Sequence, residues 1–241
     1  MIKICIDPGH GGTDRANMGP TGYVEADGVL TVSKYLQTEL LSTGAFDIML
    51  TRSMDATLSL TERAKAAIAF GAQLFISEHT NAGGGSGTEV FYSVDLPGDK
   101  SLAADMSKAI SSALGILDRG AKVRESTKYP GEDYYTVIDV AQDGGVPHVL
   151  LVESAYHDRA VEEKLLKDDA SLLKIAQAQA AVICGLFGVT YPANNELRQA
   201  VEHISAKIPG GLDIDLWSGT DNERKVKYVD LLLIKIAEAW K

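Results

Sequence analysis

Short apolar runs alternate with segments of helical spacing along the first three quarters of the chain. Ile2, Ile4 and Ile6 surround Cys5, which predicts a strand buried on both faces, and Pro8-Gly9 ends it. The same reasoning predicts further strands at residues 46–50, 74–79, 89–93, 134–140 and 146–153. Helices are predicted at residues 25–41, 59–70, 101–116 and 171–187, and a loop at residues 118–122.

Strands that alternate with helices at this spacing predict an α/β fold. We expect a twisted, mostly parallel sheet with helices on both faces. Gly188 and Pro192 mark a boundary, so we predict a catalytic domain at residues 1–190 and a small helical C-terminal domain at residues 191–241. Its two helices are expected at residues 196–208 and 222–240.

Composition narrows the classes of partner. The 241 residues are 45% hydrophobic and 23% charged, so the chain can bury a core. A net charge of −10 argues against nucleic acid and anionic membranes as partners. No apolar run approaches the roughly 20 residues that span a bilayer. Cys5 and Cys184 are interpreted as small buried hydrophobic residues without a disulfide.

Three of the predicted strands end at or near a side chain that can bind a metal ion or transfer a proton. His10 follows the first strand, His79 ends the run at 74–79, and Glu153 ends the run at 146–153. Glu25 begins the helix after the first strand. Because ligands bind at the carboxyl ends of strands in such sheets, we expect these four side chains at one edge.

Two imidazoles and one carboxylate, with a fourth position open to water, form the ligand set of catalytic zinc. Bound zinc lowers the pKa of water to about 7 and polarises a carbonyl group. The site also needs a proton acceptor, and Glu153 is placed to serve. We therefore predict one Zn²⁺ per chain, held by His10, Glu25 and His79, with Glu153 as the catalytic carboxylate. Other divalent ions are compatible with the same ligands.

Each of these side chains, taken singly, also has a structural interpretation. His10 is then a turn residue, Glu25 complements a helix dipole, and Glu153 is solvated. Asp7 is expected to fix the turn before His10. A structural role is also expected for the remaining candidates, because none joins a convergent set: Glu78, Glu89, His148, His157 and His203.

Several short motifs occur in order along residues 1–188. They are IDPGHGG at 6–12, TR at 51–52, SLTERAKAA at 59–67, SEHTNA at 77–82, GTEVFY at 87–92, RGAK at 119–122 and VPHVLLVES at 146–154. Together with Glu25 they resemble the zinc-dependent N-acetylmuramoyl-L-alanine amidases of the type-3 family. The resemblance implies hydrolysis of the amide between the lactyl group of N-acetylmuramic acid and L-alanine in peptidoglycan. It assigns zinc to His10, Glu25 and His79, and catalysis to Glu153.

The sequence departs from the family pattern at Glu78, Ile68 and residues 154–158, which bear on substrate range and leave the ligand set intact. Two competing functions are a zinc carboxypeptidase-like metallopeptidase and a non-catalytic peptidoglycan-binding protein. The first places its histidine and glutamate only a few residues apart, whereas His10 and Glu25 are fifteen apart. The second predicts a missing ligand or a missing catalytic carboxylate.

The chain starts directly with a strand, without a signal peptide pattern. We therefore expect synthesis in the cytoplasm and action on the cell wall after release, either as a phage or prophage endolysin or as a mother-cell enzyme of sporulation. The compact tail favours the endolysin. We hypothesise that residues 191–241 bind the wall or form a homodimer; the alternative is a helical pair packed on its own catalytic domain.

Overall fold

The structure is a computed structural model that describes residues 1–191. Residues Met1–Thr190 form one compact unit. The helices predicted at 196–208 and 222–240, and His203 with them, lie outside the described residues.

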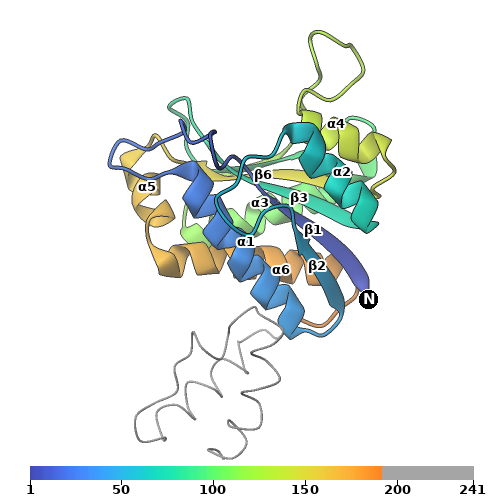
Figure 1. Cartoon of the computed structure of the whole chain (residues 1–241). Helices are drawn as coiled ribbons and strands as arrows, with labels where there is room; N and C mark the ends of the chain where they lie inside the picture. The colour runs from blue at the N-terminus through green and yellow to red at the C-terminus, as the bar shows by residue number, and fades with distance from the viewer. Residues whose placement is uncertain (192–241) are drawn as a thin grey trace, which may run out of the picture. The chain divides into compact units, whose positions relative to one another are not determined.

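A six-stranded sheet forms the centre of this unit (Figure 1). Its strands are β1 (Ile2–Pro8), β2 (Phe46–Leu50), β3 (Leu74–Asn81), β4 (Thr88–Tyr92), β5 (Asp118–Lys122) and β6 (His148–Tyr156). The order across the sheet is β2-β1-β3-β6-β4-β5. Strands β1, β2, β3 and β6 are parallel, while β4 runs antiparallel to β6 and parallel to β5. The predicted α/β fold with a mostly parallel sheet is therefore confirmed.

Helices cover both faces of the sheet, as predicted. They are α1 (Glu25–Ser42), α2 (Leu60–Phe70), α3 (Lys100–Leu114), α4 (Thr136–Asp143), α5 (Ala160–Leu166) and α6 (Asp169–Leu186), with a 3₁₀ turn η1 (Pro97–Asp99). Helix α6 packs against α1 and α3 on one face, and α2 packs against α4 on the other (Figure 1). Ser59 and Glu62 form the predicted capping box at the start of α2.

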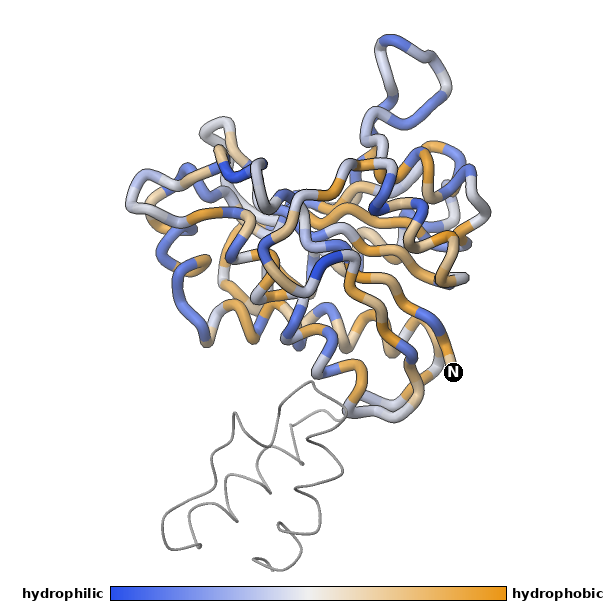
Figure 2. Tube along the Cα trace, in the orientation of Figure 1, coloured by the Kyte–Doolittle hydropathy of each residue, from blue (hydrophilic) through white to orange (hydrophobic). Residues whose placement is uncertain are grey.

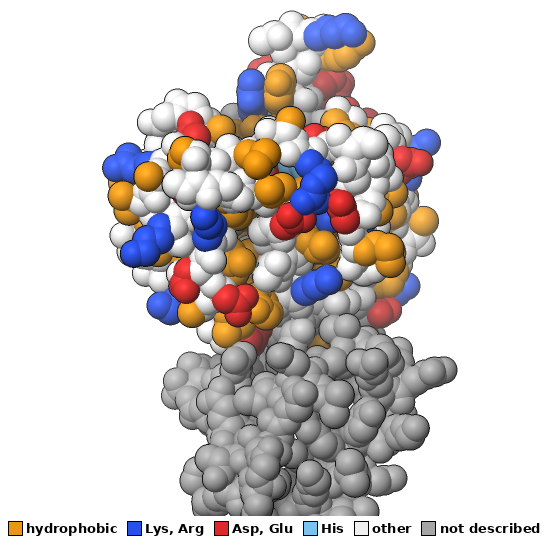
Figure 3. Space-filling view, turned by 60° about the vertical axis from the view of Figure 1, so that its left-hand side comes forward, with side chains coloured by type: hydrophobic (Ala, Val, Ile, Leu, Met, Phe, Trp, Pro, Cys, Tyr) orange, Lys and Arg blue, Asp and Glu red, His pale blue; other side chains and the backbone are white. Residues whose placement is uncertain are grey.

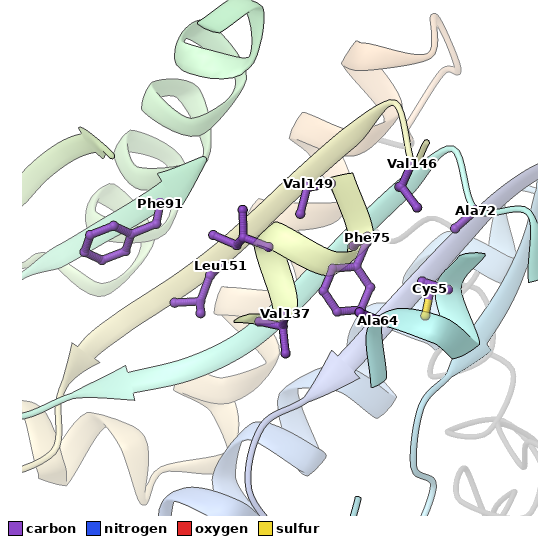
Figure 4. Close-up of a cluster of buried hydrophobic side chains, with 12 residues drawn as sticks. Cys5, Ala64, Ala72, Phe75, Phe91, Val137, Val146, Val149 and Leu151 are labelled. Carbon is purple, nitrogen blue, oxygen red and sulfur yellow. The ribbon is translucent and has the colours of Figure 1, made fainter. Parts of the chain in front are cut away.

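The core lies between the sheet and the helices, and hydrophobic residues recur along the central strands and the helices that cover them (Figure 2). Under α2 and α4, Phe75 of β3 packs among Ala64, Val137 and Val149 (Figure 4). Cys5 belongs to this cluster, and both Cys5 and Cys184 are buried and free. The prediction that the cysteines serve as small hydrophobic residues is confirmed. No described helix has the length and apolar content needed to span a bilayer.

Two predictions of local structure are wrong. Residues 134–140 were expected to form a strand, but residues 136–143 form helix α4. The expected loop at 118–122 is the edge strand β5. Helix α5 was not predicted. The parts of the sheet that carry the candidate site are unaffected, because they lie in β1, β3 and β6.

Candidate metal centre and active site

The candidate residues meet at the carboxyl edge of three neighbouring strands. His10 follows β1 by two residues, His79 lies in β3, and Glu153 pairs in register with His79 from β6. Glu25 is the first residue of α1. All four line one cavity of about 610 Å³, within the range of small-ligand pockets. The structure therefore brings together every side chain that the sequence predicted for the site.

The ligand atoms of His10, Glu25 and His79 lie at distances that suit a metal ion. His10 Nε2 lies 3.4 Å from Glu25 Oε2, and His79 Nδ1 lies 3.2 Å from Glu25 Oε1. One ligand atom from each residue lies within 4.8 Å of the other two. Ligands bound to tetrahedral zinc at their usual bond lengths are separated by about 3.3 Å. Donor type and spacing both fit a zinc ion.

The turn after β1 holds His10 in a backbone conformation that few residues adopt. His10 has a φ of 57°, in the left-handed region. The guanidinium group of Arg63 donates to the carbonyl oxygens of Pro8 and His10, at 2.6 Å each. Arg52 donates to the carbonyl oxygens of Pro8 and Gly9, at 2.9 and 2.7 Å. These two buried arginines fix the turn and give the motifs at 51–52 and 59–67 a structural role.

Gly9 leaves room for the ring of His79. A Cβ atom at position 9 would lie 2.2 Å from Cε1 of His79. No side chain therefore fits at position 9 while the imidazole keeps its place. The Pro-Gly-His sequence thus positions both histidines, one through the turn and one through the space that glycine provides.

Glu25 is held ionised although it is almost fully buried. Burial by itself would raise the pKa of this carboxyl, but the hydrogen bonds and charges of His10 and His79 outweigh it and hold the pKa well below its usual value. The backbone N–H of Thr80 donates to Oε1 at 2.8 Å, and Asn17 Nδ2 donates to Oε2 at 2.9 Å. An ionised carboxylate is the form that binds a metal ion.

Glu153 differs from Glu25 in its surroundings. Its Oε2 is buried and has no hydrogen-bond partner among the described residues. Burial, and then the charges of Glu25 and Glu89, raise the pKa of Glu153 well above its usual value. Two carboxyl groups with pKa values displaced in opposite directions suit different tasks, one as ligand and one as proton carrier.

Sequence reasoning missed two polar side chains at the centre. His157 was assigned a structural role, yet it lines the cavity, with Nδ1 2.9 Å from Thr80 Oγ1 and 3.9 Å from Glu25 Oε2. Asn17 also lines the cavity, and its Nδ2 lies 3.2 Å from His10 Nε2. His157 lies four residues after Glu153, in the turn that follows β6, where no sequence pattern indicates the direction of a side chain.

The other residues set aside from the site make contacts outside the predicted ligand set. Asp7 accepts hydrogen bonds from Ser77 at 2.7 Å and from Arg63 at 2.9 Å, so it fixes the turn as expected. His148 pairs with Asp99 at 2.7 Å. Glu89 pairs with Arg119, and Glu78 contacts Gln179.

The chain resembles known proteins over nearly all of the described part. Residues 4–184 match the family model described as N-acetylmuramoyl-L-alanine amidase. The amidase CwlM of Bacillus licheniformis is 31% identical over 79% of the chain and 70% of its own length. A sporulation-specific amidase of Bacillus subtilis is 29% identical over 75% of the chain and 66% of its length. An endolysin of Bacillus phage SPP1 is 30% identical over 77% of the chain and 66% of its length.

The catalytic domain of the amidase CwlV from Bacillus (Paenibacillus) polymyxa var. colistinus has a similar structure. It superposes with a TM-score of 0.68 at 29% identity, over 79% of this chain and 100% of that domain. The likeness therefore includes the whole of a solved catalytic domain, whereas the chain covers about two thirds of the curated relatives.

Proposed function

The chain belongs to the N-acetylmuramoyl-L-alanine amidase family, and from this membership we propose that it hydrolyses the amide between the muramoyl lactyl group and L-alanine in peptidoglycan. His10, Glu25 and His79 are the proposed ligands of one Zn²⁺ ion, and Glu153 is the proposed catalytic carboxylate. The observation that carries the proposal is the meeting of three zinc-type ligands and a separate buried carboxyl in one cavity.

Zinc bound to these residues would polarise the scissile carbonyl and make a water molecule more acidic. Glu153 takes a proton from the attacking water and passes it to the leaving nitrogen of L-alanine. Burial raises the pKa of Glu153, which makes its carboxylate a stronger proton acceptor than a solvated one. Glu25 stays ionised throughout.

Thr80 and Asn17 support the ligand carboxylate from both sides. The N–H of Thr80 fixes Oε1 of Glu25, and the amide of Asn17 reaches Oε2. The side chain of Thr80 in turn contacts His157, with Oγ1 2.9 Å from Nδ1 of the imidazole. These contacts hold the carboxylate in one orientation before any ligand binds.

The direct test is the release of new L-alanine N-termini from purified peptidoglycan. We expect release by the untreated protein, loss of release with a chelator, and recovery when zinc is restored. Reducing sugar ends should not appear, because the glycan is left intact. If zinc-loaded protein binds walls and releases no L-alanine amines, the chain is a non-catalytic binding protein instead.

Glu153→Gln tests the role of the catalytic carboxylate. The amide cannot accept the proton from water, so we expect kcat to fall by roughly 10²–10⁴-fold. Zinc content and melting temperature should show that the variant still binds metal and folds. Full activity in Glu153→Gln would exclude this residue as the proton acceptor.

We also propose that the protein acts as an endolysin, which reaches the cell wall after release from the cytoplasm. The endolysin and the sporulation-specific amidase are matched over similar shares of the chain, so the comparisons support either setting. The likeness to the phage endolysin supports this setting. Co-expression with a protein that forms holes in the membrane should trigger lysis of the producing cell, whereas expression alone should not. Lysis that does not depend on the hole-forming protein would contradict this setting.

A further inference from the structure

Arg124 is the one arginine or lysine among the described residues that line the cavity. The cavity otherwise carries two carboxyl groups, Glu25 and Glu153, and three histidines. The ion pairs that the described arginines form involve Arg15, Arg63, Arg119 and Arg159, and none involves Arg124. The cavity wall therefore presents a guanidinium group that no carboxylate of the described chain neutralises.

Arg124 belongs to the hairpin between β5 and α4, a segment that projects from the rest of the described chain (Figures 1 and 3). At its base, the N–H of Tyr134 donates to the carbonyl oxygen of Arg124 at 2.8 Å, and Glu125 pairs with Asp133 as a β-bridge. Asp133 accepts hydrogen bonds from Ser93 Oγ at 2.6 Å and from the N–H of Val94 at 3.0 Å, which ties the hairpin to the end of β4.

The side chain of Arg124 is positioned by stacking. Its guanidinium carbon lies 3.5 Å from the centre of the Tyr134 ring and 5.7 Å from that of Tyr135. Both tyrosines also line the cavity. Arg124 also hydrogen-bonds the side chain of Tyr135. A guanidinium group has five N–H donors, so the others can still form the paired hydrogen bonds that match a carboxylate.

The proposed substrate supplies such a carboxylate. The peptide that begins at the scissile L-alanine amide continues beyond it and ends in a carboxylate. Among the described residues that line the cavity, Arg124 is the one side chain that always carries a positive charge and can pair with an entering carboxylate. We propose that Arg124 binds a carboxylate of the peptide beyond L-alanine, and so selects acidic stem peptides over amidated ones. This inference rests on the proposed function.

The test combines a change in the protein with a matching change in the substrate. Soluble muramoyl-peptides from purified wall are used as isolated, and after their carboxylates are converted to carboxamides with carbodiimide in excess ammonia. For the unmodified protein, amidation should raise KM by about tenfold, the effect of losing one charge-assisted hydrogen-bonded pair. Arg124→Gln should raise KM for the native peptides by a similar factor. Its KM for the amidated peptides should equal that of the unmodified protein.

Lys128→Gln is the matched control, because it removes the same charge from the same hairpin. Lys128 stacks on Tyr129, 4.9 Å from the ring centre, and does not line the cavity. We expect its KM to be unchanged for both substrates. The assignment would be wrong if Arg124→Gln left KM for the native peptides unchanged or raised KM equally for native and amidated peptides. It would also be wrong if Lys128→Gln raised KM as much as Arg124→Gln does.

A binding measurement separates failure of this inference from failure of the proposed function. Calorimetry with the free stem peptide needs no cleavage, and Kd should rise about tenfold in Arg124→Gln and on amidation of the peptide. If zinc-loaded protein cleaves neither substrate while this difference in Kd is present, the proposed reaction is wrong and the role of Arg124 stands. Equal Kd values would remove Arg124 as the carboxylate-binding residue.

Discussion

The carboxylate of Asp14 determines which nitrogen of His10 faces the cavity. Asp14 Oδ2 lies 2.8 Å from Nδ1 of His10, which leaves Nε2 directed at Glu25. Partners of this kind orient a ligand imidazole, and their loss costs roughly 10–100-fold in metal affinity. We expect Asp14→Ala to weaken zinc binding by that factor, measured by competition with a chromophoric chelator.

Thr13→Ala is the control for this measurement. Thr13 lies next to Asp14 but bonds Thr57, away from the ligand atoms. Its zinc affinity should equal that of the unmodified protein. If Asp14→Ala also binds zinc with unchanged affinity, the contact between Asp14 and His10 has no orienting role.

The stability of the folded protein against unfolding depends on pH through the carboxyl group of Glu78. Burial raises the pKa of its carboxyl to about 8, although a hydrogen bond from Gln179 opposes the shift and the charge of Asp7 adds to it. The folded state therefore holds a proton that the unfolded chain releases near pH 4.5. The stability from this group is fully present below that pH and is lost as pH rises through about 8.

Glu78→Gln removes this titration. The difference in melting temperature between variant and unmodified protein should grow in favour of the variant between pH 5 and pH 9, a window of about the width of the shift. Asp105→Asn, at an exposed position of α3, is the control and should show no such trend. A constant difference across this range of pH would show that Glu78 is not protonated in the folded protein.

At the residue scale, the sequence was sufficient to predict the side chains that end a strand or begin a helix. His10, Glu25, His79 and Glu153 lie within three residues of such an end, and the direction of an element determines where its end lies. His157 follows β6 in a turn. The two-residue repeat of a strand and the 3.6-residue repeat of a helix do not apply there, so neither gives the direction of its side chain. Asn17 lies in the long loop before α1 and was missed for the same reason.

At the element scale, a buried ion pair joins α2 to the end of β1. Arg63 Nη1 lies 2.9 Å from Asp7 Oδ1, and both side chains are almost completely buried. Arg63→Met would leave Asp7 as an unpaired buried charge, which costs about 3–5 kcal/mol. We expect the free energy of unfolding, measured with urea, to fall by that amount.

The variant that also carries Asp7→Asn tests the reason for this loss. The second substitution removes the unpaired charge, so stability should recover in part. Recovery requires that Thr51 and Ser77 keep their bonds to the residue at position 7. A double variant less stable than Arg63→Met would show that the charge of Asp7 is not the source of the loss.

The two wrong predictions of elements have physical causes. Residues 134–140 are rich in tyrosine and β-branched residues and so resemble a strand, but Val137, Ile138 and Ala141 bury a helical face in the core shared with α2. Tertiary packing therefore overrides local propensity. Strand β5 is short, polar and at the edge of the sheet, where it pairs with β4 alone. Such a strand has no apolar pattern to detect.

At the scale of the whole molecule, the order of the strands assembles the site. The sequence predicts that strand ends share an edge, but it does not determine which strands are neighbours. The order β1-β3-β6 places His10, His79 and Glu153 on adjacent strands, and α1 returns Glu25 to the same edge. The antiparallel insertion of β4 beside β6 was not predicted, and it places Glu89 opposite Glu153.

The catalytic unit should function without the C-terminal tail. Every described residue of the site lies within Met1–Thr190, which forms a compact unit of its own. We therefore expect a chain that ends at Thr190 to cleave soluble muramoyl-peptides with unchanged kcat and KM. If the tail binds the wall, as hypothesised, the shortened chain should no longer sediment with purified walls.

The same truncation tests dimerisation. Mass per particle, measured by light scattering, should fall by more than the deleted mass if the tail joins two chains, and by the deleted mass alone if it does not. Unchanged sedimentation together with a loss of only the deleted mass would exclude both hypotheses for residues 191–241. A loss of activity on soluble substrate would instead show that the tail contributes to the catalytic unit, since soluble fragments need no anchoring to the wall.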